Sequence, residues 1–281
     1  MTLGALLDAG SRAFWWVTGR AVDLSGPERW LRAPALDRSH VGDAWLRDAA
    51  DALGGTTARG AETGLFSDMA CLDGPGFRAD ALRPQVRDFY EHTSAWRIDV
   101  WTQWNPLLQP GGALVARWFG RRVQQLAIPT RPLDVATGMD SRVVAILDDA
   151  GRQRASGWVR TLRSTGDHVY SGHYATAALP GGSQPFVHVS FPLERGNVQV
   201  FLRPQALADG SLALSSLRGP FGTEGAYVVV GRGGRHHAAR VPLHERFRVY
   251  VDGEGVLRTD HVLRLGRMTA VRLHYRMARI G

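Results

Sequence analysis

Apolar residues recur at helical spacing near the start of the chain, where leucines and aromatic residues from Leu3 to Val17 fall on one helical face. A second helix is predicted over VGDAWLRDAADAL, which follows the start signals of residues 37–39 and ends at Gly54. Residues 55–80 are glycine-rich and irregular. We therefore expect residues 1–80 to form a helical N-terminal segment that packs as a cap on the rest of the fold.

The periodicity changes from helical to alternating after a helix predicted over RPQVRDFYEH (residues 83–92). The next stretch, AWRIDVWTQW, is typical of a β-strand. Its two faces carry Trp96, Ile98, Val100 and Trp104 on one side and Arg97, Asp99, Trp101 and Gln103 on the other. Because aromatic residues occur on both faces, we expect both to be covered. A carboxylate on a covered strand needs a partner or a function, so Asp99 is a candidate acid or base, and pairing with Arg97 is the simpler alternative.

Helical spacing returns in GALVARWFGRRVQQL, which predicts an inserted helix near residues 112–126. Arg121, Arg122 and Gln125 lie on this helix, and arginine forks bind carboxylate or phosphate groups bidentately. These residues are therefore candidates for an anion clamp. Surface arginines paired with local acids such as Asp134 are an equally good interpretation.

From Asp140 onward the chain alternates between short strands and turns rich in glycine, aspartate and asparagine. The predicted strands are SRVVAIL, ASGWVRTL, HVYSGHYATA, PFVHVSF, NVQVFLR, SLALSSL, AYVVVG, HHAARV, RFRVYVD, GVLRTDHVLRL and AVRLHYRMA. Many short strands with short connections indicate an antiparallel meander. We expect a mainly β fold of the α+β class, in which residues 81–281 close as a lipocalin-like barrel or a sandwich behind the N-terminal helical layer.

Side-chain parity sorts the last three predicted strands into an apolar face and a charged face. The odd positions carry Phe247, Val249, Val251, Leu257, Leu263, Leu265, Val271, Leu273 and Met277. The even positions carry Arg246, Arg248, Arg258, Asp260, Arg264, Arg272, His274 and Arg276. We therefore expect the odd face to pack in the core. The even face is usually interpreted as a solvated outer face. The alternative is a basic platform for an anionic partner. Nucleic acid is not expected, because only Tyr250 offers a stacking ring on that face.

Three polar residues, Thr259, His261 and Tyr275, interrupt the apolar parity of the odd face. Each needs a partner, because an unpaired buried polar group costs about 1–3 kcal/mol. A satisfied core histidine is the more common explanation. The alternative is a ligand cavity, which is mostly apolar with a few placed polar groups, and a small antiparallel barrel can hold one small ligand. Tyr170, on HVYSGHYATA, is a further candidate for its lining.

The composition excludes several classes of enzyme. The chain has no lysine, so all 34 basic residues are arginine, which excludes Walker-type phosphate loops and Schiff-base or pyridoxal chemistry. The single cysteine, Cys71, excludes an internal disulfide and a cysteine-cluster metal site. GRGGR (residues 231–235) follows a strand but continues into a second strand, so it is predicted to be a hairpin turn and not a dinucleotide loop. No metal ion and no organic cofactor are predicted.

The net charge of +8 is concentrated after Gly231, where 11 arginines face 4 acids. Such a charge suggests binding to nucleic acid or to an acidic membrane. The direction in which these arginines point decides whether they form a binding surface or a solvated face. The N-terminal stretch contains Asp8 and Arg12, so it resembles neither a signal peptide nor a membrane span. We therefore expect a soluble, cytoplasmic protein without a membrane partner.

Several segments resemble the soluble C-terminal portion of bacterial YndJ-like proteins, over about residues 75–278. They are FYEHTSAWRIDVWTQW, RRVQQLAIP, RPLDVATGMDSRVV, FPLERGNVQVFLRP and RVYVDGEGVLRTDHVLRL. The resemblance implies no particular activity and no catalytic residue. Larger members of the family carry a membrane region ahead of this portion, where this chain has a short helical one.

We expect a barrel that encloses a small apolar or amphipathic molecule. If the protein is an enzyme, which the sequence leaves open, a cofactor-independent cyclase, isomerase or hydrolyase is the expected type. Its candidate acid-base residues are Asp99 and His261. The candidate ligand-binding residues are Trp96, Trp101, Trp104, Arg121, Arg122, Gln125, Tyr170, Thr259 and Tyr275. The alternative is a non-enzymatic accessory or interaction protein whose basic sheet face meets an anionic partner, and a homo-oligomer is compatible with either function.

Overall fold

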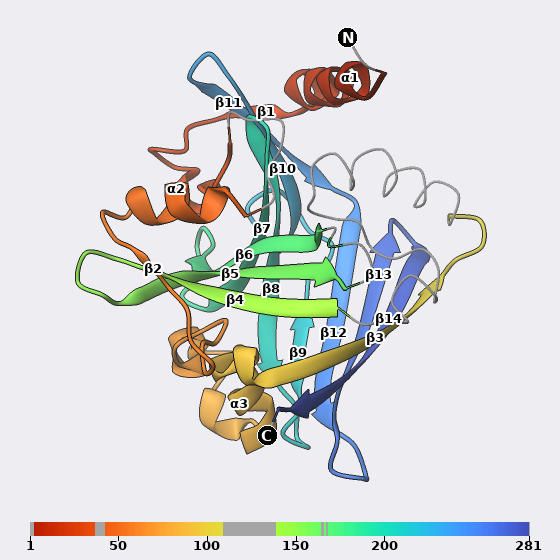
Figure 1. Cartoon of the computed structure of the whole chain (residues 1–281). Coiled ribbons are helices and arrows are strands. Elements are labelled where there is room, and N and C mark those ends of the chain that lie inside the picture. The colour runs from red at the N-terminus through yellow and green to blue at the C-terminus, as the bar shows by residue number, and fades with distance from the viewer. Residues whose placement is uncertain (1–2, 37–42, 109–138, 164–165, 167, 281) are drawn as a thin grey trace.

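The structure, a computed structural model, describes residues 3–36, 43–108, 139–163, 166 and 168–280 (Figure 1). Its helices are α1 (Leu3–Thr18), α2 (Trp45–Asp51) and α3 (Pro84–Glu91), with 3-10 turns at Arg29–Leu31, Met69–Leu72, Ala79–Ala81 and Thr93–Ala95. Its strands are β1 (Arg20–Val22), β2 (Thr57–Ala58), β3 (Trp96–Trp104), β4 (Met139–Leu147), β5 (Gln153–Leu162), β6 (His168–Ala178), β7 (Pro185–Leu193), β8 (Gly196–Ala206), β9 (Leu212–Ser215), β10 (Gly225–Arg232), β11 (Arg235–Val241), β12 (Leu243–Val251), β13 (Leu257–Leu265) and β14 (Met268–Arg279).

The strands predicted from alternating side chains are all present, as β3 to β14. GRGGR forms the predicted hairpin between β10 and β11, in which Gly233 and Gly234 adopt positive φ angles of 57° and 75°. Glycine adopts two such angles in succession without strain. The inserted helix predicted near residues 112–126 lies outside the described residues.

The strands form one antiparallel sheet with the order β2-β4-β5-β6-β7-β8-β9-β12-β13-β14-β3. Strand β8 joins its two halves, because residues 196–202 pair with β7 and residues 203–206 pair with β9. Strands β10, β11 and β1 extend the sheet from the first part of β8. In the part of the chain that the structure describes, no pairing joins the ends of this order. The mainly antiparallel β fold is thus confirmed, but the sheet is not closed as the predicted barrel requires.

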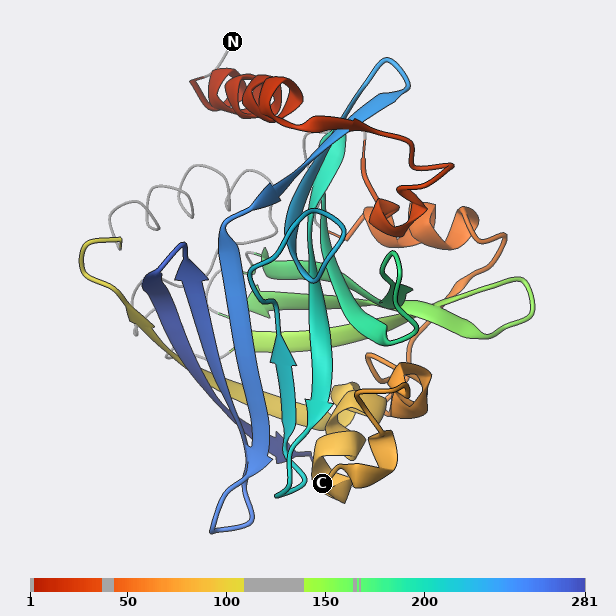
Figure 2. The same cartoon turned by 180° about the vertical axis from the view of Figure 1, so that it is seen from behind.

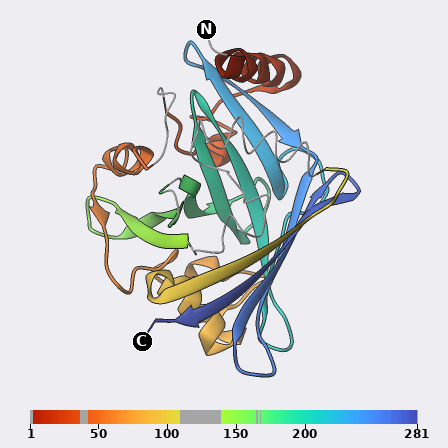
Figure 3. The same cartoon turned by 45° about the vertical axis from the view of Figure 1, so that its right-hand side comes forward.

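The sheet curves so that β4 to β6 face β12 to β14 and β3 across a shared interior (Figure 3). The main apolar core fills the lower part of this interior with residues from both sides, among them Trp158, Val189, Val249 and Met277. The predicted parity of β12 to β14 is confirmed at most positions, because the odd-numbered apolar residues before Leu265 and from Val271 onward point into the core and the even-numbered arginines face outward. Leu265 is 44% exposed, so its predicted place in the core is wrong.

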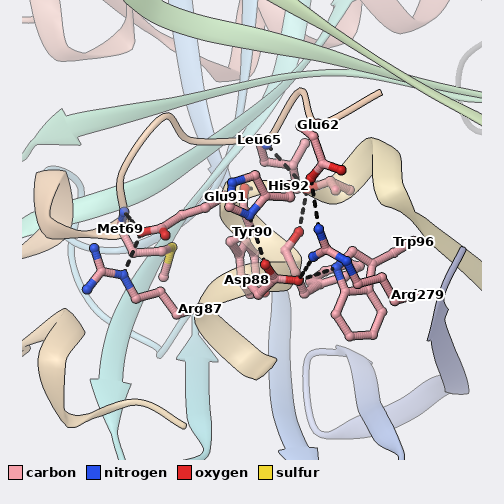
Figure 4. Close-up of polar contacts among 12 residues, drawn as sticks. Glu62, Leu65, Met69, Arg87, Asp88, Tyr90, Glu91, His92, Trp96 and Arg279 are labelled. Carbon is pink, nitrogen blue, oxygen red and sulfur yellow. Dashed lines mark hydrogen bonds and ion pairs between the residues drawn. The ribbon is translucent and has the colours of Figure 1, made fainter. Parts of the chain in front are cut away.

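Helix α3 closes the bottom of the interior. Pro84 occupies its first turn, and Val86, Phe89 and Tyr90 are buried against the core. On its other side, Asp88 accepts hydrogen bonds from the Trp96 indole at 3.0 Å and from Arg279 (Figure 4). Burial raises the pKa of Asp88, but the hydrogen bonds from Arg279 and His92 outweigh it, so this pKa lies below its usual value. The ionised carboxylate therefore ties α3 to the start of β3 and the end of β14.

Helix α2 and the 3-10 turn at Arg29–Leu31 lie on the outer face of the sheet (Figures 1 and 2), whereas Leu65, Met69 and Phe77 belong to the main core. Trp45 of α2 is fully buried and its indole donates a hydrogen bond to the Ser171 hydroxyl at 2.9 Å. A β-carbon at Gly157 would lie 2.1 Å from Cδ2 of Leu46, so the missing side chain on β5 lets α2 approach the sheet closely. Trp30 packs in the same manner against Phe201 of β8.

Two histidines lie in this outer layer, of which His188 is buried and His173 is partly buried. His188 of β7 lies 2.7 Å from the Gln199 side chain and stacks on the Phe201 ring, and the His173 ring is 6.2 Å from it. Burial lowers the pKa of His173 to about 3 and that of His188 to about 4. Both are therefore neutral in the folded protein at neutral pH, whereas in the unfolded chain each has its ordinary pKa of about 6.5.

This difference predicts acid sensitivity. The unfolded state binds protons more readily, so stability is complete above about pH 6.5 and declines as the pH falls toward the folded-state values. At about pH 5 each histidine is expected to lower the free energy of unfolding by about 2 kcal/mol. Urea denaturation between about pH 7 and 5 measures this effect, in a range where the carboxylates of the unfolded chain remain mostly ionised. The variant His173→Leu is expected to lose about half of the pH dependence, and an unchanged dependence would contradict the assignment.

Candidate functional site

A group of polar and aromatic side chains lies above the apolar core, inside the curved sheet. This interior polar cluster consists of Arg160 on β5, Tyr170 and Tyr174 on β6, Glu245 on β12, His261 on β13 and Tyr275 on β14. The three tyrosines pack against the main core. All six residues are partly buried, and they come from both sides of the interior. The fold thus brings together groups that are far apart in the sequence.

Arg160 occupies the centre of the cluster. Its guanidinium carbon lies 3.8 Å from the centroid of the Trp158 ring, 5.5 Å from that of Tyr170 and 5.8 Å from that of Tyr275. These distances are within the range of cation–π interactions. Its Nε is buried without a hydrogen-bond partner, and no ion pair joins Arg160 to a described residue. A cation in such a position leaves donors available to an anion.

The tyrosines surround this cation with neutral hydroxyl groups. The hydroxyls of Tyr170 and Tyr174 are hydrogen-bonded to each other. Burial raises the pKa of Tyr170, Tyr174 and Tyr275 above the usual value, although Arg160 opposes the shift in each. A β-carbon at Gly172 would lie 2.9 Å from the Tyr170 ring, so this glycine makes room for it. The cluster therefore offers hydroxyl donors beside a positive charge at neutral pH.

His261 and Glu245 form a second pair of groups in the cluster. Nε2 of His261 lies 3.3 Å from a carboxylate oxygen of Glu245, and their side chains are only 11% and 13% exposed. The contact has the distance of an ion pair but not the alignment of a hydrogen bond, because both ring nitrogens are buried without a hydrogen-bond partner. The imidazole stacks on Phe247 at 3.7 Å. A histidine held between a ring and a carboxylate is suited to moving a proton.

Some of the predicted site residues lie inside the curved sheet, and others lie on its outer face. Tyr170, His261 and Tyr275 belong to the cluster, and Thr259 is buried below it with its hydroxyl 3.7 Å from the Met277 sulfur. Trp96 and Trp104 point inward from β3. Arg121, Arg122 and Gln125 lie outside the described residues.

Asp99 and Trp101 lie on the outer face of β3. Trp101 is 52% exposed, so the expectation that both faces of this strand are covered is wrong. The Asp99 side chain is 40% exposed and lies 3.8 Å from Arg97, which is the simpler of the two alternatives for this carboxylate. The fold does not bring Asp99 together with His261, because the two side chains point to opposite faces of the sheet.

Three residues of the cluster, Arg160, Tyr174 and Glu245, were not among the sequence-based candidates. Glu245 has the same odd parity as Phe247, so continuing the alternation by one position would have found it. Arg160 follows Trp158 at a spacing of two, but Ala155, Gly157 and Val159 on the opposite face are buried as well. Parity does not distinguish the two faces of a strand that is covered on both sides.

The outer face of β12 to β14 carries the arginines expected from parity. Arg248 pairs with Asp209 at 2.8 Å, and Arg258 pairs with Asp252. Four further exposed arginines make no ion pair with any residue in the described ranges, namely Arg246, Arg264, Arg272 and Arg276. This basic outer face therefore retains unneutralised charge.

The fold and the cluster together define a mainly antiparallel β protein whose interior is lined by arginine and tyrosine. The chain is 26% identical, over 221 residues, to the uncharacterized membrane protein YndJ of Bacillus subtilis strain 168. The similarity covers 78% of this chain but only 39% of that protein, and it confirms the resemblance to YndJ-like proteins. No protein-family model matches the chain. No solved structure matches it either.

This comparison corrects the expected cytoplasmic location, because the relative is named a membrane protein. Among the helices that the structure describes, none has the length and apolar character needed to cross a bilayer.

Proposed function

We propose that the interior of the curved sheet binds a small amphipathic molecule whose anionic head group is held by Arg160. The observation that carries this proposal is the guanidinium itself, which lies inside the fold without a described carboxylate partner. A partly desolvated charge is costly unless it is paired. Guanidinium forks pair with carboxylates through two parallel hydrogen bonds, so a carboxylate is the head group that fits best.

The surroundings of Arg160 support an amphipathic ligand over a simple anion. The hydroxyls of Tyr170, Tyr174 and Tyr275 supply further hydrogen bonds to a head group. Beyond Tyr275, the inward-facing side chains of Trp104 and Leu263 are apolar and only partly buried. An apolar body would remove these side chains from water, which is favourable by about 25 cal/mol per Å².

We extend the proposal to the architecture, as a lipocalin-like cup. The support is that Cα atoms of β3, at one end of the strand order, and of β4, which follows the two-residue strand β2 at the other end, approach within 8 Å although β3 and β4 are not paired. A small antiparallel barrel of this kind has an interior suited to one small ligand.

Turnover of the bound molecule is a further part of the proposal. His261 would transfer a proton at the ligand, and Glu245, 3.3 Å away, would orient the imidazole and stabilise its charged form. A cofactor-independent isomerase or lyase acting on a carboxylate needs such a proton transfer and a clamp for the anion.

The test is displacement of a fluorescent amphipathic anion, anilinonaphthalene sulfonate, from the purified protein. We expect dodecanoate to displace the probe and dodecanol to do so at least about tenfold less well, because charged hydrogen bonds contribute about 1.5–3 kcal/mol. Equal displacement by the acid and the alcohol would show that no cation holds the head group. Failure of both to displace the probe would contradict binding in the interior.

The basic outer face favours a second candidate function, contact with an anionic partner. The exposed arginines Arg264 and Arg272 lack described ion pairs, and Trp101 of the neighbouring part of the sheet is exposed on the same face. Arginine and tryptophan together suit the surface of an anionic bilayer. The sequence predicts that there is no membrane partner, but the name of the Bacillus relative supports one.

Vesicle sedimentation tests this second candidate. Vesicles containing phosphatidylglycerol are expected to bind the protein at low salt, and vesicles of phosphatidylcholine are not. Reversing two charges with Arg264→Glu and Arg272→Glu should weaken binding at least about tenfold. The pair Arg47→Glu and Arg59→Glu makes the same change in net charge elsewhere, and equal losses in both double variants would argue against a defined face.

A further inference from the structure

A cavity of about 590 Å³ lies on the outer side of the sheet, away from the interior polar cluster. Three parts of the chain line it, namely the segment before Leu36, the turn between β7 and β8, and the hairpin between β10 and β11. The hairpin contributes Gly231 to Gly234 of the GRGGR stretch. We propose that this outer cavity binds a small organic phosphate, recognised through Arg195 and Arg232.

The charge of the outer cavity carries the first part of this inference. Arg195 and Arg232 are both exposed, and neither makes an ion pair with any residue that the structure describes. Glu194, which precedes Arg195, is paired with Arg12 at 3.5 Å. His236 adds an imidazole to the lining. Two guanidinium groups beside an imidazole favour an anion, and guanidinium forks match the oxygens of phosphate.

The backbone conformation of Arg195 is the second observation that supports a ligand at the outer cavity. Its φ angle of 56° is the only positive value among the described residues other than glycine. Two hydrogen bonds hold it there, from Arg195 N to Leu36 O at 2.6 Å and from Gly231 N to Arg195 O at 2.7 Å. A side chain in the left-handed region is unfavourable, and such residues concentrate at ligand-binding positions. Glycine or asparagine would fit this turn better, so the presence of arginine indicates a use for its side chain.

The remaining lining indicates the size and character of the ligand. Leu24, Leu36 and Val229 supply an apolar part of the wall. At Gly231 a β-carbon would lie 3.2 Å from the His236 ring, so the glycine leaves room for this imidazole at the cavity. The volume exceeds what inorganic phosphate needs. A phosphate ester with a small body fits, either a free nucleotide or the head group of a phospholipid.

The test measures binding of adenosine monophosphate, glycerol phosphate and inorganic pyrophosphate to the whole chain by isothermal titration calorimetry. We expect one of the two esters to bind more tightly than pyrophosphate, and the better ester distinguishes a nucleotide from a lipid head group. Arg195→Asn retains a residue that tolerates the left-handed backbone, so the fold should be kept. Both this variant and Arg232→Gln are expected to weaken binding at least tenfold.

Arg235→Gln is the matched control, because Arg235 belongs to the same hairpin but does not line the outer cavity. Its affinity should equal that of the unmodified protein, as should the affinity of Arg160→Met. The proposal is overturned if none of the three probes binds, or if Arg235→Gln loses as much affinity as Arg232→Gln. Equal binding of pyrophosphate and both esters would mean that the cavity holds any anion and selects no organic phosphate.

Discussion

Replacing Arg160 with methionine is expected to weaken binding of dodecanoate about 30-fold or more, without lowering the free energy of unfolding. The loss follows from removing the cation that pairs with the head group, because truncating one partner of a buried charge pair costs about 2–5 kcal/mol. Methionine has a similar length and keeps the contact with the Trp158 ring, which lies 3.8 Å from the guanidinium carbon. In the free protein the guanidinium lacks a described carboxylate partner, so removing its charge removes a desolvation cost.

The combination of weaker binding and retained stability distinguishes a ligand-binding arginine from a structural one. The control is Arg276→Met on β14, next to Tyr275 but on the exposed face. Dodecanoate should displace anilinonaphthalene sulfonate from this variant as well as it does from the unmodified protein. If Arg160→Met instead unfolds at lower urea concentration and binds normally, the guanidinium serves the packing of the interior, and the proposed head-group site is wrong.

The largest loss of stability is expected for Trp45→Ala, at about 3–5 kcal/mol in the free energy of unfolding. Trp45 is fully buried, and its ring covers Gly157 of β5. Removal leaves a cavity between α2 and the sheet and takes away the donor to Ser171. Because α2 is only seven residues long, it has little stability of its own and depends on this contact. Urea denaturation followed by circular dichroism measures the change.

Two further substitutions separate packing from other effects of losing a tryptophan. Trp45→Phe keeps most of the ring and loses the hydrogen bond, so it should cost less, about 1–2 kcal/mol. Trp101→Ala removes a tryptophan that is 52% exposed on β3 and should change the stability by less than about 0.5 kcal/mol. A loss of less than about 1 kcal/mol in Trp45→Ala would show that the N-terminal layer contributes little to the fold.

The strands were predictable because their alternation is strong and their turns are rich in glycine. In β12 to β14, one face packs in the core and the other faces solvent, so the polarity of a residue indicates the face on which its side chain lies. The same clarity identified Thr259, His261 and Tyr275 as inward-facing polar groups. Whether the sheet closes depends on curvature and on the pairing of its edge strands, which side-chain parity does not encode.

The centre of the site was harder to predict. Arg160 lies on β5, which is covered by α2 on one side and by the core on the other, so its sequence shows no clear alternation. Asp99 was chosen on the assumption that Trp101 is covered, and that assumption is wrong. An aromatic residue on an outer face looks the same in sequence as one in a core. Only the arrangement of the strands shows that Arg160 and Tyr275 meet across the interior.

In the proposed complex, an amphipathic acid lies inside the curved sheet with its head group at Arg160. Photo-crosslinking with a dodecanoate that carries a diazirine near its carboxyl end tests this location most directly, with the labelled residues identified by mass spectrometry. We expect labels on β5, β6 and β12 to β14 at inward-facing positions, suppressed by unlabelled dodecanoate and absent in Arg160→Met. Labels confined to the outer face, or labels that unlabelled dodecanoate does not suppress, would contradict it.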